Sequence, residues 1–172
     1  MFSVIFPGQG SQSVGMARDL YNNFSYVKDF FEEADEVLKF SIKKIIFEEI
    51  INFGCSHCNK LHKASKEFRK KFANKVEFVD IPIVFKGQDD SPLRLYYVAR
   101  KIGKGDLIKD ELFKASFIHG VNVFDPGVTN YLARSLGISK EFQKEKDLQW
   151  VNQLIRDGEK KSLIYGCLLY TS

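Results

Sequence analysis

Apolar residues recur at helical spacing over much of the chain. In residues 25–38 they return every three or four positions with charged residues on the opposite side, which predicts an amphipathic helix that begins at Ser25 and buries one face. The pattern is helical again after Gly87 and continues almost to the end. Breaks that contain glycine divide this part into four predicted helices, at residues 93–102, 107–118, 128–136 and 141–155.

Short apolar runs predict strands at three places. Residues 2–6 form one run and lead into a glycine-rich loop at residues 7–12. Residues 50–53 form a second run, and residues 75–85 form a third in which Pro82 marks a bend or an edge. With the helical block that follows, this order predicts an α/β fold.

Two apolar segments meet at Glu48 and Glu49 without a turn between them. Residues 42–47 have helical spacing, whereas residues 50–53 are typical of a buried strand. No Gly or Pro stands between the two segments. A predicted helix would have to become a strand without a turn-forming residue between them. We therefore suspect a junction between two sequences of different origin at this point.

The tetrapeptide Cys55-Ser56-His57-Cys58 lies between the predicted strand at residues 50–53 and an amphipathic helix. This spacing is typical of a redox dithiol, because the two sulfurs can close a small disulfide ring. The unpaired N–H groups at the start of the helix also favour the thiolate of Cys55. The tetrapeptide is therefore the main candidate for catalytic chemistry in the chain.

Two alternatives remain open for the cysteine pair. The first is a pair of inert buried thiols. The second is zinc, for which Cys55, Cys58 and His62 could supply three ligands, but a structural site needs four and no second cysteine pair follows. We expect no metal. The basic residues of the helix after the dithiol, including Arg69, are predicted to form its solvated face.

Composition and charge exclude several classes of protein. The 172 residues include 44% hydrophobic residues and 16 Phe, which is enough for a folded core. The formal net charge of +4 gives no reason to expect a nucleic acid partner, and no apolar stretch approaches the roughly 20 residues that cross a membrane. Three cysteines are too few for a disulfide-stapled secreted domain. Dithiol chemistry needs no cofactor, and we expect none.

The sequence Phe53-Gly54 followed by the dithiol, the strand at residues 75–85 and the long helical block resembles the DsbA-type thiol:disulfide oxidoreductases. The resemblance spans about residues 49–166, with residues 91–158 as the helical domain inserted into a thioredoxin core. It implies that Cys55 attacks, that Cys58 resolves the mixed disulfide and that a protonated His57 adds a favourable charge. It also implies protein thiols and disulfides as substrates, and a redox partner protein.

The DsbA family continues beyond the helical insertion with a cis-proline loop, two strands and a closing helix. The segment 162–166 resembles the approach to that loop, where the similarity stops. The expected fold is therefore an incomplete thioredoxin fold with an inserted helical domain. The resemblance implies a periplasmic parent, whereas the chain as written begins without an export signal, which predicts a cytoplasmic location.

The start of the chain resembles a second family. Phe6-Pro7-Gly8-Gln9-Gly10-Ser11-Gln12, followed by Val14-Gly15-Met16, is similar to the beginning of malonyl-CoA:acyl carrier protein transacylases. This resemblance covers about residues 1–48, and it implies that the backbone at Gln9 contributes to an oxyanion hole. The Gly-x-Ser-x-Gly nucleophile elbow of that family does not occur in the sequence.

The last six residues, 167–172, resemble the translation of a transposon-type sequencing adapter. Together, the unpunctuated join, the two family resemblances and this tail suggest a chimera. In this hypothesis a transacylase-like start is joined to an oxidoreductase-like interior that ends at the adapter. The main functional prediction is thiol-disulfide exchange at the dithiol. The alternatives are a transacylase fragment of fatty acid biosynthesis without its nucleophile, and a chimera without function.

Overall fold

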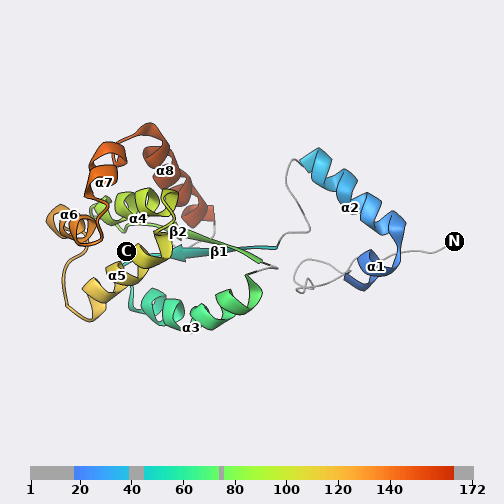
Figure 1. The fold of residues 1–172 in the computed structure, drawn as a ribbon, viewed down its shortest axis with the longest axis horizontal. Helices are drawn as coiled ribbons and strands as arrows, with labels where there is room; N and C mark the ends of the chain where they lie inside the picture. Colours follow the sequence, from blue (N-terminus) through green and yellow to red (C-terminus); the bar gives the residue numbers. More distant parts are fainter. Residues whose placement is uncertain (1–17, 39–44, 74–75, 165–172) are drawn as a thin grey trace. The chain divides into compact units, whose positions relative to one another are not determined.

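The computed structural model describes residues 18–38, 45–73 and 76–164 (Figure 1). The chain divides into two compact units, one made of residues 1–47 and 72–77 and the other of residues 48–71 and 78–172. Among the described residues, no helix combines the length and the apolar character that a membrane span requires. The predicted strand at residues 2–6, the loop with Gln9 and the tail with Cys167 lie outside the described residues.

The described residues of the first unit include the helices α1 (Arg18–Asn23) and α2 (Ser25–Leu38). The rings of Tyr21 and Phe31 meet edge to face at 5.5 Å and join the two helices. The helix predicted from Ser25 is confirmed, and the face predicted to be buried is buried only in part. Val27, Phe31 and Ala34 are half-buried, whereas Phe30 and Val37 are 72% and 74% exposed.

The sheet consists of two strands in the described part of the chain, β1 (Ile45–Ile51) and β2 (Val76–Pro82), which α3 (Ser56–Phe72) connects. The N–H of Ile83 donates to the carbonyl of Ile51 at 2.8 Å. The final residues of both strands therefore lie side by side, and the strands run parallel, as expected for a helical crossover.

The strand β1 corrects the prediction of a helix at residues 42–47. From Ile45 onward the chain is one continuous strand. Its two central glutamates point to opposite faces, where Glu49 pairs with Arg69 and Glu48 pairs with Lys161. Helices cover both faces, so charged and apolar residues do not alternate as they would in a strand with one face exposed to solvent. For this reason the spacing of apolar residues in the sequence changes at the glutamates.

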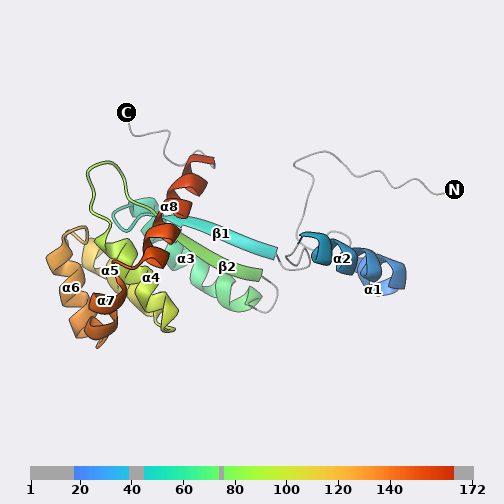
Figure 2. The same ribbon diagram turned by 90° about the horizontal axis from the view of Figure 1, so that it is seen from above.

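Helices lie on both faces of the sheet (Figure 2). On one face the rings of Phe68 in α3 and Phe78 in β2 meet edge to face at 5.7 Å. On the other face Gly158 in α8 (Gln149–Ile164) packs on β2, where a Cβ atom would lie 3.1 Å from Cγ2 of Ile81. This close approach fixes α8 against the strand.

The remaining helices form a block around α4 (Ser91–Lys101), with α5 (Gly105–Phe117), α6 (Pro126–Ser135) and α7 (Ser139–Glu145). The first three predicted helices of this part are confirmed within two residues at each end. The single helix predicted at residues 141–155 is wrong, because α7 ends at Glu145 and α8 begins at Gln149. The core of the block joins the end of β1 and includes Ile51, Phe53, Leu93, Leu95, Val98, Ile108, Leu112, Phe142 and Val151.

Arg94 explains the break between α7 and α8. Its guanidinium donates to the carbonyl of Lys146 at 2.7 Å and to Oδ1 of Asn152 at 2.9 Å, and it pairs with Asp90 at 2.7 Å. A carbonyl that accepts from a side chain in this way is taken out of a continuous helix. The helical period on both sides of the break gave no sign of it, because the partner is 52 residues away.

Candidate functional site

The two cysteines of the predicted dithiol lie at the start of α3. Cys55 stands immediately before the helix, and Cys58 is its third residue. The N–H of Cys58 donates to Sγ of Cys55 at 3.4 Å. Cys55 thus occupies the position of a helix N-cap, and its sulfur takes the place of the oxygen that usually accepts from the third N–H. Both cysteines are free thiols in this structure.

The two thiols have different surroundings. The pKa of the Cys58 thiol is raised to about 11 by burial, by its hydrogen bond with Cys55 and by the negative charges of Cys55 and Glu49. The backbone of Asn52 acts in the opposite direction, since it donates a hydrogen bond to the sulfur. At neutral pH Cys58 is therefore protonated, and it cannot be the thiol that attacks first.

The turn between β1 and α3 is held by Asn52, which is 2% exposed. Its carbonyl accepts from the N–H of Cys55 at 3.0 Å, and its Oδ1 accepts from the N–H of Gly54 at 2.9 Å. Its Nδ2 donates to the carbonyl of Ile83 at 3.0 Å and to Oε1 of Gln88 at 2.8 Å. The dithiol turn is therefore tied to the segment that follows β2.

Gly54 is the residue of this turn that the helical block approaches most closely. A Cβ atom at this position would lie 2.9 Å from Cε2 of Phe124 and 3.4 Å from Oδ1 of Asn52. Real Cβ contacts are essentially never shorter than 3.0 Å. The ring of Phe124, from the segment before α6, thus lies against the turn and leaves room only for glycine.

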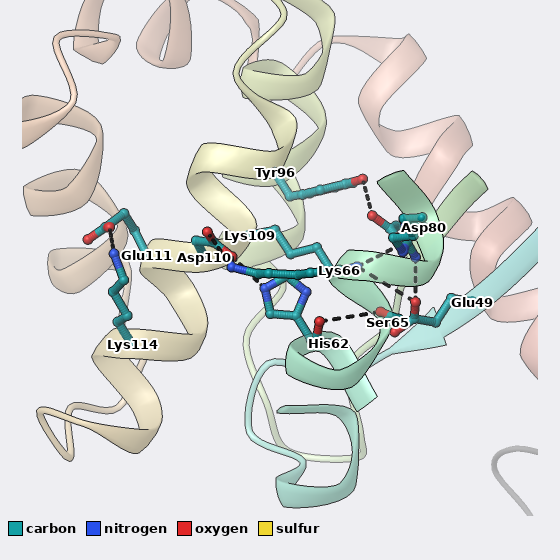
Figure 3. Close-up of polar contacts among 11 residues, drawn as sticks. Glu49, His62, Ser65, Lys66, Asp80, Tyr96, Lys109, Asp110, Glu111 and Lys114 are labelled. Atoms are coloured by element: carbon teal, nitrogen blue, oxygen red, sulfur yellow. Dashed lines mark hydrogen bonds and ion pairs between the residues drawn. The ribbon is translucent and has the colours of Figure 1, made fainter. Parts of the chain in front are cut away.

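A buried cluster of charged residues joins the two strands to α3 and α5 (Figure 3). Lys109 from α5 is 1% exposed and donates to Oδ1 of Asp80 at 2.8 Å. Arg69 from α3 donates to the same oxygen at 2.5 Å and also pairs with Glu49. Tyr96 from α4 donates to the other oxygen of Asp80 at 3.2 Å. Two cations thus neutralise two carboxylates inside the protein.

The cluster shifts the acidities of its members. Burial alone would raise the pKa of Asp80, but Lys109 and Arg69 outweigh it, and the pKa is lowered below its usual value of 3.8. The pKa of Tyr96 is raised by burial and by the charge of Asp80. The prediction that Arg69 belongs to a solvated face is wrong, because its side chain is only 18% exposed and lies against both carboxylates.

His62 joins α3 to α5 instead of facing the cysteines. Its Nε2 lies 2.5 Å from Oδ1 of Asp110, and its ring stacks on Phe113 at 5.0 Å. Burial lowers the pKa of His62, and Lys109 and Lys66 lower it further, against the attraction of Asp110. No group of three potential metal ligands occurs in residues 18–38, 45–73 and 76–164. The partner of His62 is thus a carboxylate, so its placement gives the zinc alternative no support.

Sequence reasoning located the dithiol but missed its supporting residues. His57 lies in the first turn of α3 and is exposed, so its proposed electrostatic role stays a prediction. The sequence pattern marks Glu49 only as part of the suspected junction. Two acidic residues inside an apolar strand nevertheless indicate that each has a cationic partner in the fold. Lys109 follows Ile108 and stands three and four residues before Leu112 and Phe113. All four residues are buried. A lysine on an apolar helix face was the signal that could have identified it.

The fold is the thioredoxin-like fold with a helical insertion that DsbA structures share. Among solved structures, DsbA from Xylella fastidiosa matches 71% of this chain and 67% of its own, at a TM-score of 0.63 and 21% identity. DsbA from Pseudomonas aeruginosa matches 73% of this chain and 66% of its own, at a TM-score of 0.62 and 16% identity. At these identities the likeness concerns the fold.

A second set of relatives matches a short segment. Malonyl CoA-acyl carrier protein transacylase from Bacillus subtilis is 48% identical over 44 residues, which is 26% of this chain and 14% of the relative. The enzyme from Staphylococcus aureus is 45% identical over 47 residues, or 15% of its length. The chain thus spans about a seventh of these relatives. No family model matches the chain.

The two kinds of similarity agree with the two family resemblances that the sequence shows. One part of the chain is transacylase-like, and the part with the dithiol has the DsbA-like fold. The transacylase matches extend over 44 and 47 residues, close to the 48 residues expected. Both halves of the suspected chimera are therefore supported by similarity to unrelated proteins.

Proposed function

We propose that the chain exchanges thiols and disulfides with protein substrates through Cys55 and Cys58. One observation carries the proposal: Sγ of Cys55 accepts the N–H of Cys58 at the start of α3, while burial keeps Cys58 protonated. The helix start stabilises negative charge on Cys55 only. The pair is thus divided into an attacking and a resolving sulfur, and the DsbA-like fold supports this assignment.

In the reducing direction, the Cys55 thiolate attacks one sulfur of a substrate disulfide, and the other substrate sulfur leaves as a thiolate. Cys58 then loses its proton and attacks Sγ of Cys55. This step releases the second substrate sulfur and closes the disulfide between Cys55 and Cys58. The dithiol has been oxidised and its two electrons and two protons have passed to the substrate, whose sulfurs end as two thiols; the oxidising direction is the reverse sequence.

Alkylation of Cys55 as a function of pH tests this proposal. Cys167 is first replaced by serine, and the modified residue is identified by mass spectrometry. We expect Cys55 to be the residue that is modified at neutral pH, and Cys58 to react only at high pH. A Cys55→Ser variant should lose exchange with a protein disulfide. Modification of Cys58 before Cys55 would contradict the proposal.

Acyl transfer is not proposed for this chain, although its start is similar to transacylases. The sequence holds no Gly-x-Ser-x-Gly motif that would supply the nucleophile. Incubation with malonyl-CoA should therefore leave no malonyl ester on a serine. Mass spectrometry of the intact chain checks this expectation, and a stable mass increase of one malonyl group would refute it.

A further inference from the structure

Asn52 does more than fill space beneath the dithiol. It is 2% exposed, and every polar atom of its side chain has a partner in the structure. Its Oδ1 and its carbonyl hold two consecutive N–H groups, those of Gly54 and Cys55. Its backbone also donates to Sγ of Cys58. One residue therefore contacts both ends of the dithiol turn.

The amide of Asn52 is itself fixed by Gln88, from the segment between β2 and α4. Oε1 of Gln88 accepts from Nδ2 of Asn52 at 2.8 Å and from the N–H of Phe85 at 2.8 Å. The same Nδ2 donates to the carbonyl of Ile83 at 3.0 Å. Gln88 uses only its oxygen in these contacts. It is a bridge between the loop after β2 and the turn that carries the cysteines.

We propose that Asn52, held by Gln88, is a positioning residue that keeps Sγ of Cys55 aligned with the N–H of Cys58. This inference rests on the proposed function, since it concerns the thiolate that starts the exchange. The nitrogen of Cys58 lies 3.4 Å from the sulfur, and the strength of this hydrogen bond depends on that separation and on its alignment. A small displacement of the turn therefore weakens it. Asn52 and Gln88 act on the chemistry through this alignment and do not touch the substrate.

Two substitutions at Gln88 separate this role from a general contribution to stability. Gln88→Ala removes the bridge from a half-buried position that is not part of the dithiol. Gln88→Glu keeps an oxygen where both donors need an acceptor, so it should preserve the alignment. Gln143→Ala is the matched control, because it removes a surface glutamine that bonds only Asn130.

The experiment measures the rate of Cys55 alkylation from pH 4 to 9 in the full chain with Cys167→Ser, at about 0.15 M salt to screen added charge. We expect Gln88→Ala to slow alkylation at pH 6 by about threefold or more, the effect of losing part of one hydrogen bond. Its profile should move to higher pH. Gln88→Glu and Gln143→Ala should follow the parent chain. Urea unfolding of each variant reports stability separately.

The outcomes distinguish the inference from the proposed function. Modification of Cys58 before Cys55 in the parent chain would overturn both. An alkylation rate of Cys55 that Gln88→Ala leaves unchanged, whatever its stability, would overturn the positioning role alone. Equal shifts in Gln88→Ala and Gln88→Glu would also overturn it, because the acceptor would then not matter. Asn52→Ala should show a larger shift if it folds, and if it does not fold the Gln88 pair decides the question.

Discussion

Replacement of Lys109 by methionine is the sharpest test of the buried cluster. Nζ of Lys109 lies 2.8 Å from Asp80 and 3.8 Å from Glu49. At an effective dielectric constant of about 20 these distances correspond to gross attractions of about 6 and about 4 kcal/mol. Desolvation of the ammonium offsets several kcal/mol of this attraction. Lys109→Met leaves two carboxylates with only Arg69, and we expect the free energy of unfolding to fall by about 3 to 5 kcal/mol.

Urea unfolding followed by the fluorescence of Trp150 measures this loss, because Trp150 is the single tryptophan of the chain and belongs to α8. Lys66→Met is the matched control. Lys66 also pairs with a carboxylate at 2.8 Å, but its side chain is 53% exposed, and exposed pairs contribute only about 0 to 1 kcal/mol. The double variant Lys109→Met/Asp80→Asn should recover part of the loss, since it removes the uncompensated charge.

The pH dependence of the free energy of unfolding gives a second test of the same cluster. Because the pKa of Asp80 lies below its usual value of 3.8, its contribution to stability is present above that value and is lost as the pH falls. Without Lys109 the pKa of Asp80 rises, so the difference between Lys109→Met and the parent chain should narrow in acid. A loss below about 1 kcal/mol, equal to that of Lys66→Met, would refute the reasoning.

Three further predictions concern single residues. Because the pKa of His62 is lowered, stability should fall as the pH drops below 6.5, and His62→Gln should flatten this part of the profile in urea unfolding at pH 5 and 7. Gly54→Ala should cost about 1 to 3 kcal/mol, and the added substitution Phe124→Leu should restore part of it, as thermal unfolding would show. Arg94→Met should cost about 2 kcal/mol in urea unfolding, whereas an unchanged midpoint would contradict its role between α7 and α8.

The features that the sequence predicted correctly are those set by neighbours along the chain. The place of the two cysteines at the start of a helix, the helix α3 itself and the helices α4 to α6 each have a local signal in spacing or in glycine punctuation. The missed features depend on distant partners. The sequence could not predict that Arg69 belongs to a buried cluster, because this depends on the position of Asp80 and Glu49 opposite it. Likewise, Arg94 ends α7 through a carbonyl that is far away in the sequence.

The structure removes one reason to place a junction at Glu48 and Glu49. The apolar spacing in the sequence predicts a helix that becomes a strand there, but the structure has one strand from Ile45 to Ile51. A strand needs only β-branched or aromatic residues at its start, and Ile45, Ile46 and Phe47 fit it whatever their origin. The pattern therefore neither supports nor opposes a junction. The hypothesis of a chimera depends on the similarity of the chain to two unrelated kinds of protein.

The residues that shape the chemistry of Cys55 all come from the part of the chain with the DsbA-like fold. Asn52, Gln88 and Glu49 hold the turn or act on the resolving thiol, and α3 supplies the N–H that Sγ of Cys55 accepts. None of these contacts involves the transacylase-like start. Thiolate chemistry and substrate exchange should therefore be separable. Cys55 should react as an activated thiol even where exchange with a folded protein disulfide is slow, because exchange also needs a surface that orients the substrate.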